Sequence, residues 1–146
     1  MVDSDSLQRF VDAQSDGYGD VTRELTHGRK QTHWMWFVFP QLKGLGHSAT
    51  AQHFGIASLD EARGYLAHPV LGPRLRECAG LLRDHPGGFP IDLILGSTDA
   101  LKLRSSMTLF VRASTEPADR DLFSAVLDRY YGGEPDPRTL AMLSAD

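Results

Sequence analysis

Disulfide pairs, long apolar runs and an excess of basic residues are all missing from this chain. Its one cysteine among 146 residues, Cys78, excludes an internal disulfide, and its helical surroundings predict a small buried hydrophobe. No apolar run approaches the roughly 20 residues that span a bilayer, so we expect no membrane partner. Lys and Arg number 15 against 19 Asp and Glu, a formal net charge of −4. Because nucleic-acid-binding proteins usually carry a basic surface, we expect no nucleic-acid partner.

Signatures of export, metal binding and nucleotide binding are missing too. Residues 1–6 are acidic and polar and lack the basic and apolar regions of a signal peptide, so we expect a cytoplasmic protein. The six histidines form no HExxH motif or other close metal-ligand pair. The sequence has no Walker loop and no dinucleotide-binding fingerprint, and we therefore expect no metal and no cofactor.

Length and composition are those of one ordinary globular domain. Hydrophobic residues make up 41% of the chain and charged residues 23%. No internal repeat, linker or low-complexity tract divides the sequence. We therefore predict a single domain over residues 1–146, with an ordered core from about residue 5 to residue 143, that is a monomer or a weak oligomer.

Helix signals recur along the chain, whereas no pair of strands is evident. Residues 58–61 (Ser-Leu-Asp-Glu) form a capping box, in which the serine and the glutamate each accept from a free amide of the first turn. Asp136 followed by Pro137 is an N-cap with proline at the first helical position, and Gly132 or Gly133 offers a left-handed stop. We predict an all-α fold, a single compact domain of roughly seven to nine short packed helices.

The aromatic segment 33–41 (His-Trp-Met-Trp-Phe-Val-Phe-Pro-Gln) holds both tryptophans and is the most apolar part of the chain. We predict a buried helix over residues 30–39, because Pro40 ends a helix at the preceding residue. Its aromatic neighbours should bury His33, which would then need a hydrogen-bond partner. Large aromatics beside Lys30, His33 and Gln41 are typical either of a core helix or of the wall of a ligand pocket, and the sequence leaves both open.

A glycine-containing loop, residues 43–48, directly precedes the next expected helix. Gly44 and Gly46 permit tight backbone conformations, and the free amides of a helix that starts at Ser48 attract anions. A phosphate or carboxylate could therefore bind there. The alternative is an ordinary turn with Ser48 as a structural N-cap.

The expected helix over residues 99–112 begins with polar side chains on one face. Asp99, Lys102 and Ser106 are three and four residues apart, and Ser105 lies three beyond Lys102. A lysine beside a serine can activate it as a nucleophile, but that chemistry also needs a desolvated amine and an oxyanion site. We favour a polar cluster that lines a cleft, with a plain surface ion pair between Asp99 and Lys102 as the alternative.

Together these segments predict a cleft between the helix 30–39, the loop 43–48 and the helix 99–112. In this hypothesis the protein binds a small molecule or anion, with catalysis left open. Lys30 and Lys102 hold the anion, Trp36 stacks, His33 and Gln41 form hydrogen bonds, and the helix end at Ser48 donates amides. The candidate ligand-binding residues are Lys30, His33, Trp36, Gln41, Gly44, Gly46, Ser48, Asp99, Lys102, Ser105 and Ser106. The alternative is a helical protein-interaction module without catalytic activity, which would expose a large apolar patch.

Four segments, residues 30–41, 44–48, 65–72 and 99–110, together resemble one bacterial family, the domain of unknown function 1810, and its actinobacterial or mycobacterial members in particular. The resemblance runs from about residue 7 to residue 143. It implies a small, mainly helical fold and supplies no reaction, cofactor or catalytic residue. Some relatives are labelled calpastatin, an inhibitor that is a disordered acidic chain, whereas this sequence has the composition of a packed globule.

Overall fold

Ten helices account for most of residues 4–144, the part of the chain that this computed structural model describes. No strand occurs in that part; it has one isolated parallel bridge, between Leu42 and Ile56. The helices are α1 (Ser4–Gln14), α2 (Tyr18–His27), α3 (Met35–Val38), α4 (Ala49–Phe54), α5 (Leu59–Ala67), α6 (Leu71–Arg83), α7 (Ile91–Leu95), α8 (Ser97–Ala113), α9 (Pro117–Tyr131) and α10 (Pro137–Ser144). The predicted all-α class is confirmed. The described residues form ten helices where the sequence predicted roughly seven to nine, and α3 and α7 are the two shortest of the ten.

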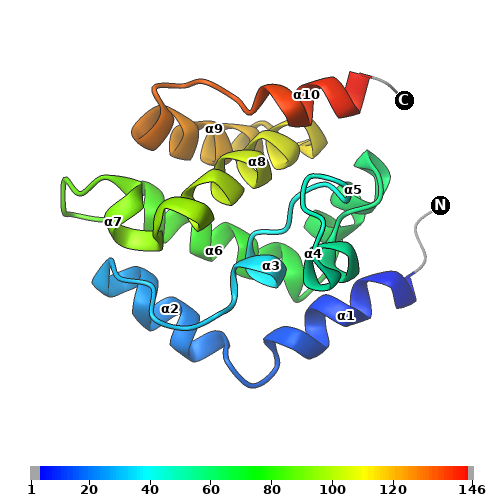
Figure 1. The fold of residues 1–146 in the computed structure, drawn as a ribbon, viewed down its shortest axis with the longest axis horizontal. Helices are drawn as coiled ribbons and strands as arrows, with labels where there is room; N and C mark the ends of the chain where they lie inside the picture. The colour runs from blue at the N-terminus through cyan, green and yellow to red at the C-terminus, as the bar shows by residue number, and fades with distance from the viewer. Residues whose placement is uncertain (1–3, 145–146) are drawn as a thin grey trace.

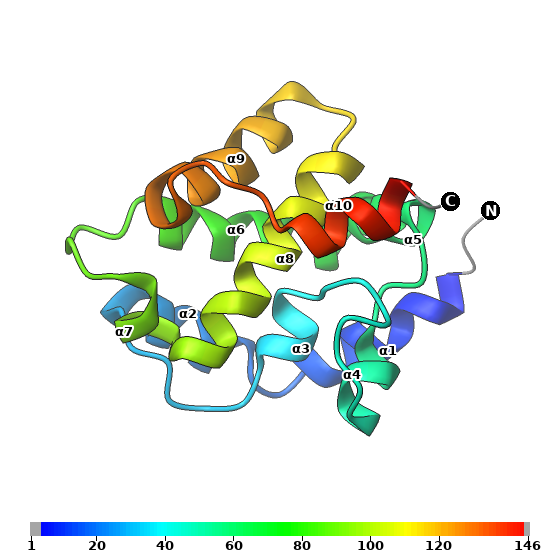
Figure 2. The same ribbon diagram turned by 45° about the horizontal axis from the view of Figure 1, so that its top comes forward.

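Helix α8 is the centre of the molecule. It packs against α5, α7, α9 and α10, and it crosses the middle of the view in Figure 2. Every residue from Ser105 to Phe110 on α8 is buried, which is the pattern of a helix surrounded by protein on all sides. Helices α1 and α2 lie at the opposite side of the molecule from α9 and α10 (Figure 1).

A chain of aromatic rings connects four helices through the core. Phe10 of α1 meets Tyr65 of α5 edge-on at 5.2 Å between ring centroids, Tyr65 meets Phe110 of α8 at 5.5 Å, and Phe110 meets Phe123 of α9 at 5.9 Å. All four rings are fully buried. Such tilted and edge-on pairs add to the free energy of area burial, and here they fix α8 between α5 and α9.

The starts of α4 and α5 have the serine N-caps seen in the sequence. The hydroxyl oxygens of Ser48 and Ser58 accept the amides three residues on, at 3.1 Å in both cases. The carboxylate of Glu61, however, accepts the amide of Ala57 instead of that of Ser58, and it also pairs with Arg9 at 3.0 Å. The capping box is therefore half formed, because its glutamate is drawn into a contact between α1 and α5.

The prediction of a helix over residues 30–39 is wrong in extent, since α3 covers only Met35–Val38. The buried carboxylate of Glu24, on α2, accepts the amides of Gln31 and Thr32 at 2.6 and 2.9 Å and the indole N–H of Trp34 at 3.0 Å. These bonds, with that from the Lys30 amide to Ile94 O at 2.7 Å, hold residues 30–32 in a non-helical conformation. His33, expected to be buried, is exposed on this non-helical segment.

Candidate functional site

A cleft of about 340 Å³ lies where α3 and the segment after it meet the first turns of α8 and α10. In Figure 2 these parts surround the middle of the molecule, with α3 on one side of α8 and the start of α10 beside it. The residues that line the cleft are Trp36, Gln41, Leu45, Gly46, Thr98, Leu101, Lys102, Arg104, Ser105, Asp136 and Arg138.

The segment 41–46 is held in place by backbone hydrogen bonds and by a glycine. The amide of Lys43 donates to Ile56 O at 2.8 Å, and the amide of Ile56 donates to Gln41 O at 2.9 Å. A Cβ on Gly46 would lie 2.8 Å from the Cβ of Ala51, so only glycine lets this wall approach α4 so closely. The wall of the cleft that carries Gln41 is therefore fixed by its backbone.

Two lysines share one carboxylate beside the cleft. Lys30 Nζ lies 2.9 Å from one oxygen of Asp99, and Lys102 Nζ lies 3.4 Å from the other. The three side chains are only 9–18% exposed. Asp99 and Lys102 thus form more than a surface ion pair, because Asp99 also fastens the segment after α2 to the start of α8.

Each of these lysines also lies over an indole. Lys102 Nζ is 3.6 Å from the centre of a Trp36 ring, and Lys30 Nζ is 5.3 Å from that of Trp34. Such cation–π contacts hold an ammonium group in one position. The predicted stacking of a ligand on Trp36 is restricted accordingly, since one face of this ring is already covered by Lys102.

The α8–α10 junction closes one end of the cleft around Asp136. The carboxylate accepts the hydroxyl hydrogens of Ser105 at 2.9 Å and Thr139 at 2.6 Å, and the amide of Thr139 at 3.3 Å. Burial opposes ionisation, but these hydrogen bonds outweigh it and hold the pKa of Asp136 below its usual value. Asp136 is therefore ionised and stabilised by its neighbours, and the hydroxyl of Ser105 serves as its donor.

This arrangement gives no support to a serine–lysine nucleophile. Ser105 donates to Asp136, while the amine of Lys102 is engaged by Asp99 and Trp36. Ser106 is fully buried, and its hydroxyl has no hydrogen-bond partner within the described part of the chain. Nucleophile activation requires an amine within reach of the hydroxyl and free to take its proton.

The structure brings five of the predicted site residues into one cleft and leaves the others out. Trp36, Gln41, Gly46, Lys102 and Ser105 line it, and Lys30 and Asp99 support it from behind through their ion pairs. The remaining four, which do not line it, are the exposed His33 and Gly44, the α4 N-cap Ser48, and the buried Ser106. Ligand binding by these residues stays a prediction.

Several lining residues were not among the predicted site residues, namely Leu45, Thr98, Leu101, Arg104, Asp136 and Arg138. Asp136 was recognisable only as a helix cap. Arg104 and Arg138 are separated by more than thirty positions, and they line the same cleft only because α10 packs against α8. No local pattern could have paired them, since the packing of α10 is a tertiary contact.

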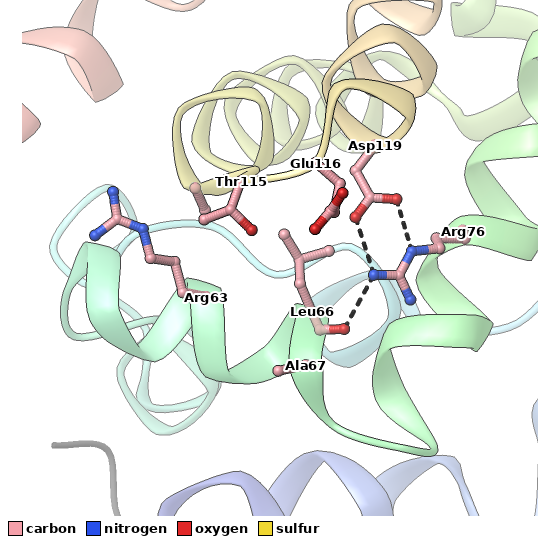
Figure 3. Close-up of a pocket in the computed structure, with 8 residues that line it drawn as sticks. Arg63, Leu66, Ala67, Arg76, Thr115, Glu116 and Asp119 are labelled. Atoms are coloured by element: carbon pink, nitrogen blue, oxygen red, sulfur yellow. Dashed lines mark hydrogen bonds and ion pairs between the residues drawn. The ribbon is translucent and has the colours of Figure 1, made fainter.

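A second cavity, of about 240 Å³, lies between α5, α6 and the start of α9 (Figure 3). Arg76, at one side of this cavity, pairs with both carboxylate oxygens of Asp119 at 2.8 and 3.0 Å and donates to Leu66 O at 3.2 Å. Hydrogen bonds and charge from Asp119 raise the pKa of Arg76 above its ordinary value. These contacts join three helices, so Arg76 and Asp119 have a structural role at this cavity.

Residues 4–144 contain neither a metal-binding cluster nor a membrane-spanning helix. Within that range, no group of three or more His, Cys, Asp or Glu side chains is placed to hold a metal ion. None of the helices in the same range is long and apolar enough to cross a membrane.

The fold and the cleft define a compact all-α protein with a cation-lined concave site. The chain belongs to the family described as protein of unknown function, DUF1810, which matches residues 4–143. It is similar to the crystal structure of the conserved hypothetical protein Rv1873 from Mycobacterium tuberculosis, with 54% sequence identity and a TM-score of 0.91 over 97% of this chain and 99% of that chain. None of the curated proteins matches the chain.

Proposed function

We propose that the cleft between α3, α8 and α10 binds a small anion and that the protein is a binding protein for an anionic metabolite. The observation that carries this proposal is the charge of the cleft. Lys102, Arg104 and Arg138 line it with the carboxylate of Asp136. Asp99 and Glu134 pair with Lys102 and Arg104, so Arg138 is the lining cation without an ion pair in residues 4–144. In a chain with a formal net charge of −4, the four cations Lys30, Lys102, Arg104 and Arg138 outnumber the carboxylates of Asp99, Glu134 and Asp136, and this local excess of positive charge attracts anions.

The arginines have unequal freedom to bind. Arg104 donates to the backbone carbonyl of Glu134 at 3.0 Å and lies 3.7 Å from its carboxylate. Arg138 is exposed and makes no ion pair within residues 4–144. A guanidinium offers several donors in a fixed fork that matches a carboxylate or phosphate, so Arg138 is the first donor we assign to a ligand.

Inorganic phosphate is the first probe, because it tests the charge of the cleft without any other recognition. We expect phosphate to shift the NMR signals of the Trp36 indole N–H and the Gln41 side-chain amide. The double variant Arg104→Gln, Arg138→Gln should bind phosphate at least about tenfold more weakly, since each charged hydrogen bond contributes about 1.5–3 kcal/mol. Circular dichroism would establish that the variant keeps the fold.

The control removes the same charge elsewhere. Arg112 and Arg120 are exposed and lie outside the cleft, so the double variant Arg112→Gln, Arg120→Gln has the same net charge as the cleft variant. It should bind phosphate as the unmodified protein does. Equal weakening in both double variants, or phosphate-induced shifts that avoid the cleft, would show that the attraction is general and that the cleft is not the site.

Binding without a reaction is the extent of the proposed activity, because Ser105 and Lys102 are both engaged by carboxylates. We also propose a cytoplasmic monomer or weak oligomer. The support is that the single cysteine, Cys78, is free and buried and needs no oxidising compartment. Cell fractionation and light scattering across a range of protein concentrations test these two points, and a dimer that persists on dilution would contradict the second.

A further inference from the structure

One wall of the cleft is apolar and open to solvent. Three large hydrophobic side chains are strongly exposed in the described part of the chain, Phe89 at 54%, Leu93 at 67% and Leu101 at 68%. Among them Leu101 lines the cleft, next to the partly buried Leu45 and Trp36. Leu101, Leu45 and Trp36 thus place apolar surface in the same cleft as Lys102, Arg104 and Arg138.

The other two exposed hydrophobic residues lack this setting. Leu93 does not line the cleft. Phe89 lines a different hollow together with Arg129, but that guanidinium already donates to the backbone carbonyls of Leu82, Arg83, His85 and Gly87. The cleft therefore combines an exposed apolar side chain, Leu101, with a guanidinium free to bind, that of Arg138. The hollow around Phe89 does not, because Arg129 is already engaged.

The apolar and cationic ends of the cleft are about one helical turn apart. Leu101 shares a face of α8 with Arg104 and Ser105, three and four residues further on, and one turn rises about 5.4 Å. Ser105 in turn bonds to Asp136, which places the start of α10 at the cationic end. A ligand that satisfies both ends therefore needs an apolar body about as long as one ring.

From this arrangement we infer that the ligand is an amphipathic anion, with a charged head at Arg104 and Arg138 and an apolar body, a ring or short acyl chain, against Leu101 and Leu45. The inference rests on the proposed function and narrows it to a class of ligand. The volume of about 340 Å³ lies at the lower end of the range for ligand pockets, about 300–1,000 Å³, which suits such a small molecule better than a dinucleotide.

Phenyl phosphate and inorganic phosphate test the inference, because they carry the same head and differ in the ring. We expect phenyl phosphate to bind at least about tenfold more tightly in NMR titrations, since the ring removes apolar surface of Leu101 and Leu45 from water. Leu101→Ser should weaken phenyl phosphate at least about fivefold and leave inorganic phosphate unchanged. Leu93→Ser, which alters an equally exposed leucine outside the cleft, should change neither.

The outcomes separate the inference from the function on which it rests. If both phosphates bind with the same affinity, or if Leu101→Ser has no effect on phenyl phosphate, the ligand is not amphipathic although the cleft still binds anions. If Leu93→Ser weakens phenyl phosphate as much as Leu101→Ser, the ring binds nonspecifically and the inference is wrong. If neither compound binds, the proposed function and the inference both fail. If benzoate binds more tightly than phenyl phosphate and Leu101→Ser weakens it as well, the inference holds and the head group of the ligand is a carboxylate.

Discussion

Gly72→Ala is expected to lower the free energy of unfolding by about 2–3 kcal/mol, although alanine is the better helix former by about 1 kcal/mol. Gly72 lies in the first turn of α6 and is buried. A Cβ built on it would lie 2.2 Å from Leu66 O and 3.0 Å from the carbonyl carbon. The obstacle is backbone at the end of α5, so it cannot be relieved by a side-chain rotation.

The same carbonyl is part of a compact joint between α5 and α6. Arg76 donates to Leu66 O at 3.2 Å, and the amide of Gly72 donates to His68 O at 3.0 Å. A methyl group at position 72 would push these helices apart and weaken both bonds. Because α5 also carries Tyr65 of the aromatic chain, the displacement would reach the core.

Gly80 supplies the matched control in the same helix. A Cβ there would meet no atom within 4 Å, so Gly80→Ala is expected to raise stability by about 0.5–1 kcal/mol. Urea unfolding followed by circular dichroism measures both variants. Equal stabilisation by the two substitutions would mean that α5 and α6 separate easily, and the close approach at Gly72 would then contribute little to the fold.

Local chemistry was sufficient to predict most of the helices. The N-caps Ser48 and Ser58, the left-handed stops Gly28 and Gly132 and the N-terminal Asp136 of α10 all act within a few residues of their place in the sequence. A helix end depends mainly on such neighbours, so it can be read without knowledge of the tertiary fold. The all-α class follows from the same signals.

The aromatic segment could not be predicted, because a distant residue decides its conformation. The indoles and phenylalanines around Met35 are compatible with a helix, yet the carboxylate of Glu24 and the carbonyl of Ile94 hold the amides of residues 30–32 in a non-helical conformation. Nothing around Glu24 in the sequence distinguishes it from a surface glutamate of α2. Its burial arises only when α2 packs beside α6 and the segment 30–34 folds over it.

The cleft was predicted in part for the same reason. Trp36, Gln41 and Lys102 are conspicuous in the sequence as a tryptophan and two polar residues within apolar or helical segments, and the structure brings them together in the cleft. Arg104 and Arg138, on which the proposed binding depends most, look like ordinary exposed arginines. They line one cleft because Asp136, at the start of α10, forms hydrogen bonds with Ser105 and Thr108 of α8 and holds the two helices together.

Replacement of Glu24 by glutamine is expected to lower the free energy of unfolding by about 3 kcal/mol at neutral pH and to remove an acid-sensitive part of the stability. Burial opposes the charge of Glu24, but hydrogen bonds from Gln31, Thr32 and Trp34 outweigh it and lower the pKa of its carboxyl from 4.5 to about 2. A depressed pKa in the folded protein means that this stabilisation is fully present above pH 4.5 and is lost as the pH falls toward 2. A shift of this size corresponds to about 3 kcal/mol.

The measurement is urea unfolding of both proteins between pH 7 and pH 2.5. The difference in stability between them should be constant above about pH 5 and should shrink below it, because glutamine does not titrate. Glu116→Gln, at an exposed carboxylate, is the control and should leave the pH profile unchanged. A difference that stays constant down to pH 2.5 would show that the carboxylate charge of Glu24 does not hold the segment 30–34. If the profile behaves as expected, Glu24→Gln should also bind phosphate more weakly. The segment 30–34 positions Lys30, which pairs with Asp99, and Asp99 in turn pairs with Lys102 of the cleft.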